Sequence, residues 1–490
     1  MYRRTYLKLA GSMALGSLSA KAQQSPAPAN LETRRELFVD RYLIDRMDGT
    51  DLRLQSPIQC EQVLTLDRPW EGAFCGYFTV IHDGADFHLY YRGIGSAGAD
   101  GRGAESTCYA HSTDGIHWTR PSLGLFEVNG TKDNNVILAH QPPFSHNFCP
   151  FVDTRPGVPA AERFKALGGV KQSGLMGFAS ADGVHWKRLQ AQPVLPPATA
   201  SAYDSQNLAF WSAAENCYVC YYRTFKKIEG MGGVRWISRA TSPDFRTWET
   251  GREMTFGDAP PEHLYTNQTS PYIRAPHIYV SIAARFMPGR QVISNSEAVS
   301  IGVHPDYYKD CADAVVLTSR GGFQYDRQFL EGFLRPGVGL ENWVSRDNYP
   351  ALNIVQTGPA EMSFYVNRHY GQPSAHLSRY KLRLDGLASL HAPYKGGEMI
   401  TKPLIFTGNR LELNYATSAA GFLRAEVQTV EGTPLRGFAL ADCREIIGDR
   451  IERDVEWTAG NDVSPLAGKP VRLRFQMKDA DLFSLRFRTA

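Results

Sequence analysis

Short apolar runs separated by turn residues recur along most of this chain. The first group has runs at 77–81, 87–92 and 106–111, with Asp83-Gly84 at one of the turns. Comparable groups follow at 148–179, 208–248, 270–318 and 351–384. Runs of this length, rich in β-branched and aromatic residues and bounded by Gly, Asp or Pro, are typical of strands joined in meander order. The pattern therefore predicts five consecutive sheet units.

A repeated turn marks the same position in successive sheet units. The segment 112–118 reads Ser-Thr-Asp-Gly-Ile-His-Trp and returns at 180–186, more loosely at 241–248 and in degenerate form at 318–325. Its Asp can bond backbone N–H groups and its Gly tolerates positive φ, so each copy predicts a tight turn followed by a large ring that fills the gap between neighbouring sheets. Repetition at a regular interval indicates a repeated structural unit.

Five small sheets bury their faces only if they pack on one another. Stacked around an axis they form a five-bladed β-propeller, which we predict over residues 36–392. Consecutive β-sandwiches are the alternative. After a linker at 391–397, the runs at 411–415, 422–427 and 471–475 alternate strictly, which favours sheets with one buried face. The predicted fold is all-β, a five-bladed β-propeller followed by a β-sandwich over residues 398–490.

The first residues predict export. A basic segment with Arg3-Arg4 precedes a modestly apolar run at 9–20 and the small-x-small site Ala20-Lys21-Ala22. We interpret residues 1–22 as a twin-arginine-type signal peptide, which implies a periplasmic or secreted protein. The run is too short for a membrane span, and no later stretch qualifies.

Composition narrows the function further. The net charge of +3 gives no electrostatic reason to expect nucleic acid as a partner. The eight cysteines are dispersed, and Cys217 and Cys220 would face opposite sides of a strand, so we expect mostly buried thiols with at most one or two bridges. No zinc spacing, phosphate loop, nucleophile elbow or dinucleotide fingerprint occurs. We predict no metal and no cofactor, although channel carboxylates could hold a divalent ion.

Candidate chemistry gathers before the inner strands, which begin around the propeller axis. These segments are more polar than the strands that follow, and their convergence favours a hydroxyl-rich ligand, because carboxylates and amides bind diols and aromatic faces stack on sugar rings. Two carboxylates could then work at a glycosidic bond as acid and base, or as acid and nucleophile. The candidate catalytic residues are Asp204, Asp347, Glu71 and Glu262. The candidate substrate-binding residues are Trp70, His146, Asn147, Gln206, Asn207, His263, Tyr265, Asn267, Gln268, Glu341, Arg346, Asn348 and, at the rim, Glu105.

Structural roles are the alternative for each of these residues. An Asp before a strand is often a turn cap, Arg346 and Asp347 could form a structural pair, and His263 could be a core histidine.

The chain resembles the five-bladed propeller glycosidases, especially glycoside hydrolase family 32 with its C-terminal β-sandwich, and is also similar to family 43. The repeated turns at 112–118 and 180–186, the segment 105–108 and the domain after Gly397 carry the resemblance. It implies cleavage or transfer of glycosyl groups by three carboxylates, one from each of the first three blades.

The family's catalytic motifs do not carry over. Blade one has Trp70-Glu71-Gly72 where the family has Asn-Asp-Pro, and blade two has His146-Asn147 without a carboxylate. Blade three has Asp204 instead of Glu-Cys, and the only Arg-Asp pair of the predicted propeller, Arg346-Asp347, lies in blade five. The resemblance thus supports the fold more than the site.

The leading prediction is an exported glycoside hydrolase that acts on a poly- or oligosaccharide in the propeller funnel. A non-catalytic carbohydrate-binding propeller and a structural or protein-interaction propeller are the alternatives. The expected partner is a carbohydrate.

Overall fold

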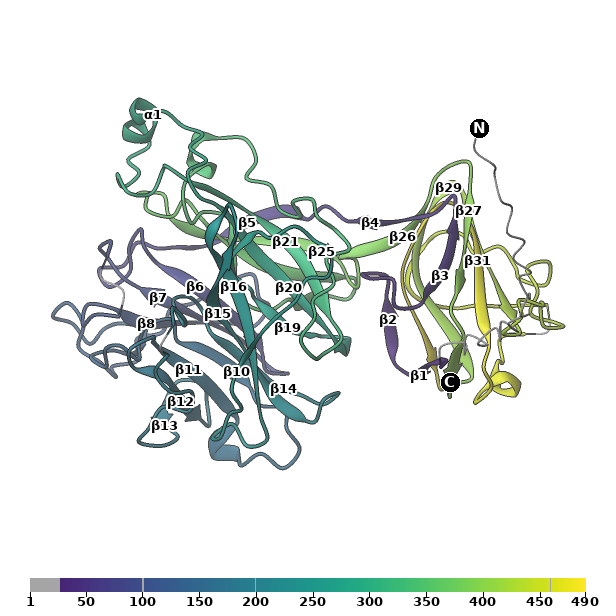
Figure 1. Cartoon of the computed structure of the whole chain (residues 1–490), viewed down its shortest axis with the longest axis horizontal. Helices are drawn as coiled ribbons and strands as arrows, with labels where there is room; N and C mark the ends of the chain where they lie inside the picture. The colour runs from purple at the N-terminus through teal and green to yellow at the C-terminus, as the bar shows by residue number, and fades with distance from the viewer. Residues whose placement is uncertain (1–26, 99–100, 199, 459) are drawn as a thin grey trace, which may run out of the picture.

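The computed structural model describes residues 27–98, 101–198, 200–458 and 460–490. Strands dominate this part of the chain, and its only α-helix is the short α1 (Asn295–Ser300). None of its helices is long and apolar enough to cross a membrane. The predicted signal peptide at 1–22 lies outside the described residues. Figure 1 shows two β domains joined at a narrow neck.

Five antiparallel sheets make up the larger domain, and the first four run in chain order from an inner to an outer strand. Blade one contains β6 (Gly76–His82), β7 (Phe87–Gly93), β8 (Ser106–Ser112) and β9 (Val136–Leu138). Blade two contains β10 (Cys149–Val152), β11 (Phe164–Val170), β12 (Gly174–Ser180) and β13 (Lys187–Arg188). Blade three contains β14 (Leu208–Ser212), β15 (Cys217–Ile228), β16 (Gly232–Ser242) and β17 (Arg252–Glu253).

The last two blades have divided inner strands. Blade four contains β18 (His263–Thr266), β19 (Thr269–Tyr272), β20 (Ala275–Met287) and β21 (Cys311–Ser319). Blade five contains β22 (Tyr349–Pro350), β23 (Val355–Gly358), β24 (Glu361–Arg368), β25 (His376–Arg383) and, as its outermost strand, β5 (Ile58–Thr65). The strand order confirms the predicted five-bladed β-propeller.

The ring of blades is closed in two places. β5 comes from the N-terminal side of the chain yet pairs with β25 of the last blade. The inner strands of blades one and five also meet, since the Leu352 amide donates to the Phe78 carbonyl at 2.8 Å and the Val80 amide donates to the Leu352 carbonyl at 3.1 Å. Closure of this kind leaves few unpaired strand edges.

Two glutamines fill the propeller axis. Gln206 Nε2 donates to Thr79 Oγ1 at 2.6 Å and lies 3.4 Å from Cys149 Sγ. Gln268 Nε2 donates to Gln206 Oε1 and to the Pro350 carbonyl, each at 2.8 Å. These five residues come one from each blade and are all buried. Because buried amides need partners, this network joins the blades and plugs the axis.

The aromatic rings of the repeated turns pack between blades, as predicted. Trp118 of blade one lies 5.9 Å from the ring of Tyr365 in blade five, and Trp186 of blade two lies 6.3 Å from Tyr90 in blade one. In the third copy Phe245 takes this position, at 5.4 Å from Phe151. Aromatic pairs in this distance range stabilise the contact beyond simple burial.

The smaller domain is built on one eight-stranded hydrogen-bonded sheet, with β1 and β28 as a separate pair. Its strands are β1 (Ala29–Glu32), β2 (Arg35–Leu37), β3 (Ile44–Asp48), β4 (Asp51–Leu54), β26 (Ala388–Ala392), β27 (Gly397–Thr401), β28 (Leu404–Phe406), β29 (Arg410–Gln428), β30 (Asp449–Asp454) and β31 (Arg472–Arg488). The long strands β29 and β31 pair along most of their length, with a register break between Thr417 and Phe422. The network is continuous, so the two-layer β-sandwich stays a prediction.

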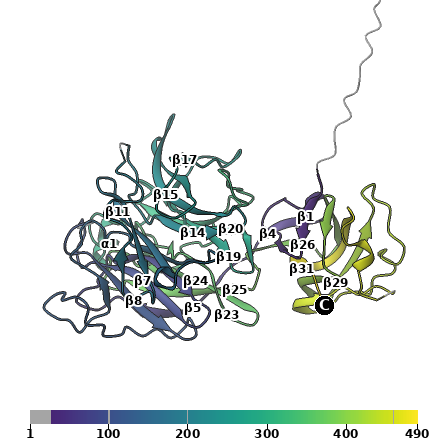
Figure 2. The same cartoon turned by 90° about the horizontal axis from the view of Figure 1, so that it is seen from below.

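The domain boundary differs from the sequence-based one. We assigned residues 36–392 to the propeller and 398–490 to the second domain. In the structure β2, β3, β4 and β26 all pair within the smaller domain's sheet. Alternation in such short strands does not reveal which sheet they join, because that depends on distant partners. The chain therefore crosses between the domains at 55–57 and again at 384–387, near β4 and β26 (Figure 2).

The smaller domain contacts the end of the propeller opposite to the starts of the inner strands. Glu36 accepts hydrogen bonds from His277 Nε2 and Arg320 Nη1, each at 2.8 Å, and Arg320 also contacts Asp40 at 2.8 Å. His277 follows the turn between β19 and β20, and Arg320 follows β21. The starts of the inner strands therefore face away from the smaller domain.

All eight cysteines are free thiols, six of them buried, which confirms the prediction of mostly buried thiols.

Candidate functional site

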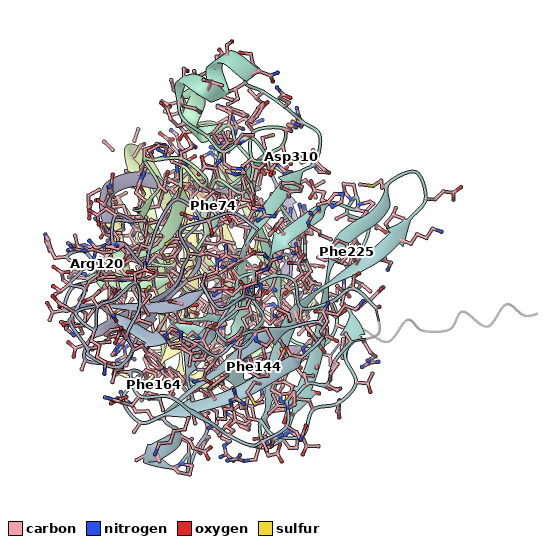
Figure 3. All side chains as sticks on the ribbon, turned by 90° about the vertical axis from the view of Figure 1, so that its left-hand side faces the viewer. Phe74, Arg120, Phe144, Phe164, Phe225 and Asp310 are labelled. Carbon is pink, nitrogen blue, oxygen red and sulfur yellow. The ribbon has the colours of Figure 1, made fainter. Side chains whose placement is uncertain are left out.

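Each blade brings a non-glycine residue with left-handed backbone to the start of its inner strand. These residues are Tyr77 (φ 55°), Asn147 (φ 52°), Tyr203 (φ 63°), Gln268 (φ 49°) and Arg346 (φ 58°). The left-handed region is unfavourable for bulky L-residues, although asparagine tolerates it, and it recurs at functional sites as well as in turns. Figure 3 views the molecule from the side away from the smaller domain and shows Phe74, Phe144, Phe225 and Asp310 spread around this end. We call this end the funnel.

A small hollow of arginine and tyrosine, about 10 Å³ in volume, lies in the funnel between blades one and five. Its lining consists of Gly76, Tyr77, Arg92, Arg346, Tyr349, Asn367 and Tyr370. Arg92 lies 4.8 Å above the ring of Tyr77 and donates to Tyr370 Oη at 3.3 Å. Wider hollows exist elsewhere, for example around Arg472 on the smaller domain, but there the arginine is already paired with Asp45.

Three guanidinium groups surround one ring next to this pocket. The Tyr265 centroid lies 4.3 Å from the guanidinium carbon of Arg223, 5.0 Å from that of Arg235 and 5.6 Å from that of Arg346. An aromatic face attracts each cation by about 0.5–2 kcal/mol, but the cations repel one another. Burial lowers the pKa of Arg235, and the neighbouring Arg223 lowers it further.

Asp204 is the carboxylate that the structure places at this cluster. Its Oδ2 lies 3.0 Å from Arg223 Nη2, and its side chain is 63% exposed. Within the described part of the chain, no carboxylate lies within 4.0 Å of Arg235 or Arg346. His263 accepts from the Arg235 amide at 3.3 Å. Its pKa is lowered by burial and by Arg235 and Arg223, which keeps this histidine neutral near pH 7. Asp204, His263, Tyr265 and Arg346 are therefore predicted residues that the fold brings together.

A second predicted group extends from the same pocket into blade two. His146 Nδ1 lies 2.9 Å from Glu105 Oε1, and Asn147 Nδ2 lies 2.8 Å from His146 Nε2. Since the amide donates to Nε2, the proton of a neutral His146 sits on Nδ1 and is donated to Glu105. Glu105 Oε1 also lies 3.8 Å from Arg92 Nε. All four side chains are buried, so they form the funnel wall.

Trp70 and Glu71 lie outside the funnel, contrary to the prediction. Trp70 Nε1 donates to Asn135, next to the outermost strand β9, at 2.7 Å. Glu71 is buried and accepts from Tyr91 Oη at 2.5 Å and from Arg120 Nη1 at 2.7 Å. The loop before β6 crosses outward over blade one, so both side chains hold this blade together.

Glu262 is also a structural carboxylate. It contacts Arg285 at 2.8 Å and Arg327 at 2.7 Å, so two arginines of blade four neutralise it. Arg285 pairs with Asp313 as well, at 2.6 Å.

Asp347 is buried behind the funnel wall in blade five. Its Oδ1 accepts from the His369 amide at 2.7 Å. Burial raises the pKa of Asp347 to about 7, against the lowering effect of the Arg368 charge. No hydrogen bond or ion pair of the described residues joins Asp347 to Asp204. Two of the four predicted catalytic carboxylates are thus separated: Asp204 lies in the funnel, and Asp347 is buried in blade five.

The remaining predicted residues make hydrogen bonds that stabilise the fold. Gln206 and Gln268 form the axial plug and are not open to a substrate. Three asparagines bond backbone: Asn207 donates to the Tyr203 and Ser205 carbonyls, Asn348 to the Ala312 and Asn342 carbonyls, and Asn267 Oδ1 accepts from the Thr269 amide. Glu341 offers its carbonyl to Gln372. These positions need their amide or backbone groups for the fold.

Several funnel residues were missed by sequence reasoning. They are Tyr77, Arg92, Arg223, Arg235, Tyr349 and Tyr370. Most lie within strands, whereas the prediction considered only the segments before them. An arginine inside an otherwise apolar strand such as β15 was the available signal, since a buried cation needs a partner.

The part of the chain that the structure describes contains no group of three His, Cys, Asp or Glu side chains that could hold a metal ion. No family model and no curated protein matches the chain.

Solved structures with a similar fold were found. One is a glycoside hydrolase (TM-score 0.46, 11% identity, 66% of this chain and 92% of that chain covered). Another is a fructofuranosidase from Schwanniomyces occidentalis (TM-score 0.40, 10% identity, 88% and 98% covered). A third is an N-acetylgalactosamine deacetylase from F. plautii (TM-score 0.42, 12% identity, 69% and 96% covered). Likeness at this level carries no argument about activity, so function must be argued from the funnel itself.

Proposed function

We propose that this protein is an exported glycoside hydrolase that binds a poly- or oligosaccharide in the funnel. The observation that carries the proposal is the pocket of tyrosine and arginine between blades one and five, beside a cluster of three guanidinium groups and the exposed carboxylate of Asp204. Tyrosine faces offer stacking surfaces for sugar rings, and guanidinium and amide groups offer hydrogen bonds to their oxygens. Backbone strain maintained in every blade supports a functional role for this end.

Asp204 is the proposed acid/base residue. Among the four predicted catalytic carboxylates it has by far the most exposed side chain and lies on the funnel side, whereas Glu71, Glu262 and Asp347 are held within their blades. A general acid or base must reach the glycosidic oxygen or a water, and Asp204 meets this condition.

The test is hydrolysis of a glycan panel by the mature protein, with products identified by mass. Asp204→Asn should reduce turnover of any substrate found by roughly 10²–10⁴-fold, the usual contribution of a general acid or base. Asp51→Asn is a matched control, because Asp51 has a similarly exposed side chain but lies on the smaller domain. Full activity of Asp204→Asn would rule out this assignment.

A non-catalytic carbohydrate-binding propeller is the second candidate. It is favoured by the fact that three of the four predicted carboxylates are tied up in structural contacts. It predicts saturable binding of an oligosaccharide without any product, and equal behaviour of the wild type and Asp204→Asn in the hydrolysis assay.

Export is part of the proposal and rests on the Arg3-Arg4 segment. Replacing both residues by lysine should retain the precursor in the cytoplasm, as shown by cell fractionation and immunoblotting. Unchanged export of the double variant would exclude the twin-arginine route.

A further inference from the structure

We propose that the funnel recognises an anionic carbohydrate, one that carries a carboxylate or a sulfate group. The binding groups are the guanidinium groups of Arg235 and Arg346, assisted by Arg223. This inference rests on the proposed carbohydrate function and specifies the substrate class of the same site.

The first argument is the crowding of cations. Arg223, Arg235 and Arg346 lie within 5.6 Å of the centroid of one ring, Tyr265. The side chain of Arg223 is only 2% exposed, so solvent screens these charges poorly. One carboxylate, Asp204, faces this group of three cations. The described residues thus leave an excess of positive charge at the base of the funnel.

The second argument is a contrast with other arginines of the propeller. Arg285 contacts both Glu262 and Asp313, and Arg379 contacts both Glu61 and Glu361. Some arginines that act structurally in the propeller are thus neutralised by two carboxylates each. Arg346, in contrast, contacts the rings of Tyr265, Tyr307 and Tyr370 and no carboxylate within the described residues. Its charge remains available to a ligand, and a planar guanidinium suits carboxylate and sulfate oxygens.

The third argument is the polar lining beside Arg346. Tyr349 Oη and Asn367 Oδ1 are buried in the same pocket and have no hydrogen-bond partner in the structure. Buried polar atoms usually have a hydrogen-bond partner, so these two can bond to a ligand or to a water. A neutral donor and a neutral acceptor next to a cation fit a sugar that has hydroxyl groups and one anionic group. Arg346 lines this pocket and has a left-handed backbone, φ 58°.

The experiment is calorimetric titration of the full mature protein with three size-matched probes. Trigalacturonate carries carboxylates, a sulfated galactan oligosaccharide carries sulfate esters, and galactotriose is neutral. We expect one of the anionic probes to bind at least about tenfold more tightly than galactotriose, because a charge-assisted hydrogen bond contributes about this factor. Comparison of the two anionic probes identifies the group.

Variants connect the preference to the cluster. Arg346→Gln and Arg235→Gln should each weaken binding of the preferred anionic probe by roughly ten- to hundredfold and leave galactotriose nearly unaffected. Arg346→Lys should recover part of the loss, since it restores the charge without the planar fork. Arg444→Gln, at a 73% exposed side chain on the smaller domain, is the control and should bind like the wild type. Thermal unfolding midpoints verify that each variant is folded.

Four results would overturn the inference: equal affinity for neutral and anionic probes, no binding of either anionic probe, unchanged binding by folded Arg346→Gln, or inorganic sulfate binding as tightly as the oligosaccharides. The proposed hydrolase activity fails separately. Hydrolysis of neutral glycans that depends on Asp204 would keep the activity and reject the anionic preference. Binding of an anionic probe without any hydrolysis product would keep the anionic preference and reject the hydrolase activity.

Discussion

Asp347 illustrates, at the scale of one residue, how burial changes a carboxyl group. Its folded-state pKa is raised to about 7 by burial, well above the unfolded value of about 4. Between these two values the folded protein holds a proton that the unfolded chain has released. The stabilisation from this group is therefore complete below about pH 4 and is lost as the pH rises toward 7.

Asp347→Asn should therefore become increasingly favourable as the pH rises. We expect similar stability of the wild type and the variant near pH 4, and an advantage for the variant of up to about 4 kcal/mol above pH 7. His369, whose pKa is lowered to about 4, chiefly by burial, contributes with the opposite sign but is present in both proteins. Urea unfolding across this pH range measures the difference. A difference that stays constant across this pH range would show that folding does not raise the pKa of Asp347.

Glu71 gives a second prediction at this scale. Glu71→Gln should lower the free energy of unfolding by about 3 kcal/mol, because it breaks a buried pair with Arg120. Glu445→Gln, at a half-exposed pair with Arg424, should cost no more than about 1 kcal/mol. Denaturant titration measures both. If Glu71→Gln abolished glycan hydrolysis in a stably folded protein, Glu71 would again be a candidate catalytic residue.

Some site residues could be located from the sequence because of their position relative to the inner strands. Asp204, Tyr265 and Arg346 directly precede or begin inner strands, and all inner strands start around one axis. Which side chains then turn into the funnel depends on loop paths that sequence does not reveal. The loop with Glu71 turns outward, and Asp347 turns into its own blade. Arg223 was missed because it lies within a strand.

At the scale of elements, the repeated turn has one shared hydrogen-bond pattern. In the second copy Ser180 Oγ accepts from the Gly183 amide at 2.9 Å, and Asp182 Oδ1 accepts from the Val184 and His185 amides at 2.9 and 2.8 Å. The first and third copies have the same bonds. The degenerate fourth copy lacks the Asp, and its Arg320 instead binds Glu36 and Asp40 of the smaller domain. The fourth copy differs in sequence because this turn contacts the smaller domain.

Asp182→Ala should lower the free energy of unfolding by about 1–2 kcal/mol, since two hydrogen bonds to backbone amides are lost. Asp114→Ala should cost about the same, because its turn is equivalent. Thermal or urea unfolding measures both. Glycan binding by the folded variants should be unchanged, because these turns lie outside the funnel. A loss of binding without loss of stability would contradict this structural role.

At the scale of the whole molecule, blades were predictable and the domain boundary was not. Each blade is a local meander, so its strands and turns appear in order along the sequence. The smaller domain combines strands from both ends of the described chain, and such non-local pairing leaves no local signal. The outermost strand of blade five, β5, has the same origin.

This topology predicts that the smaller domain cannot fold from its C-terminal part alone. A fragment of residues 397–490 lacks β1 to β4 and β26, which pair with β27, β28 and β31 or with one another. It also leaves Glu412 without Arg35, its buried partner at 2.7 Å. We therefore expect an unfolded or aggregated fragment by circular dichroism and amide hydrogen exchange. Joining residues 27–54 and 388–396 to it through flexible linkers should restore exchange protection in β31, because the edge strands and the buried ion pair return. A stable isolated fragment would show that β27 to β31 suffice for this core.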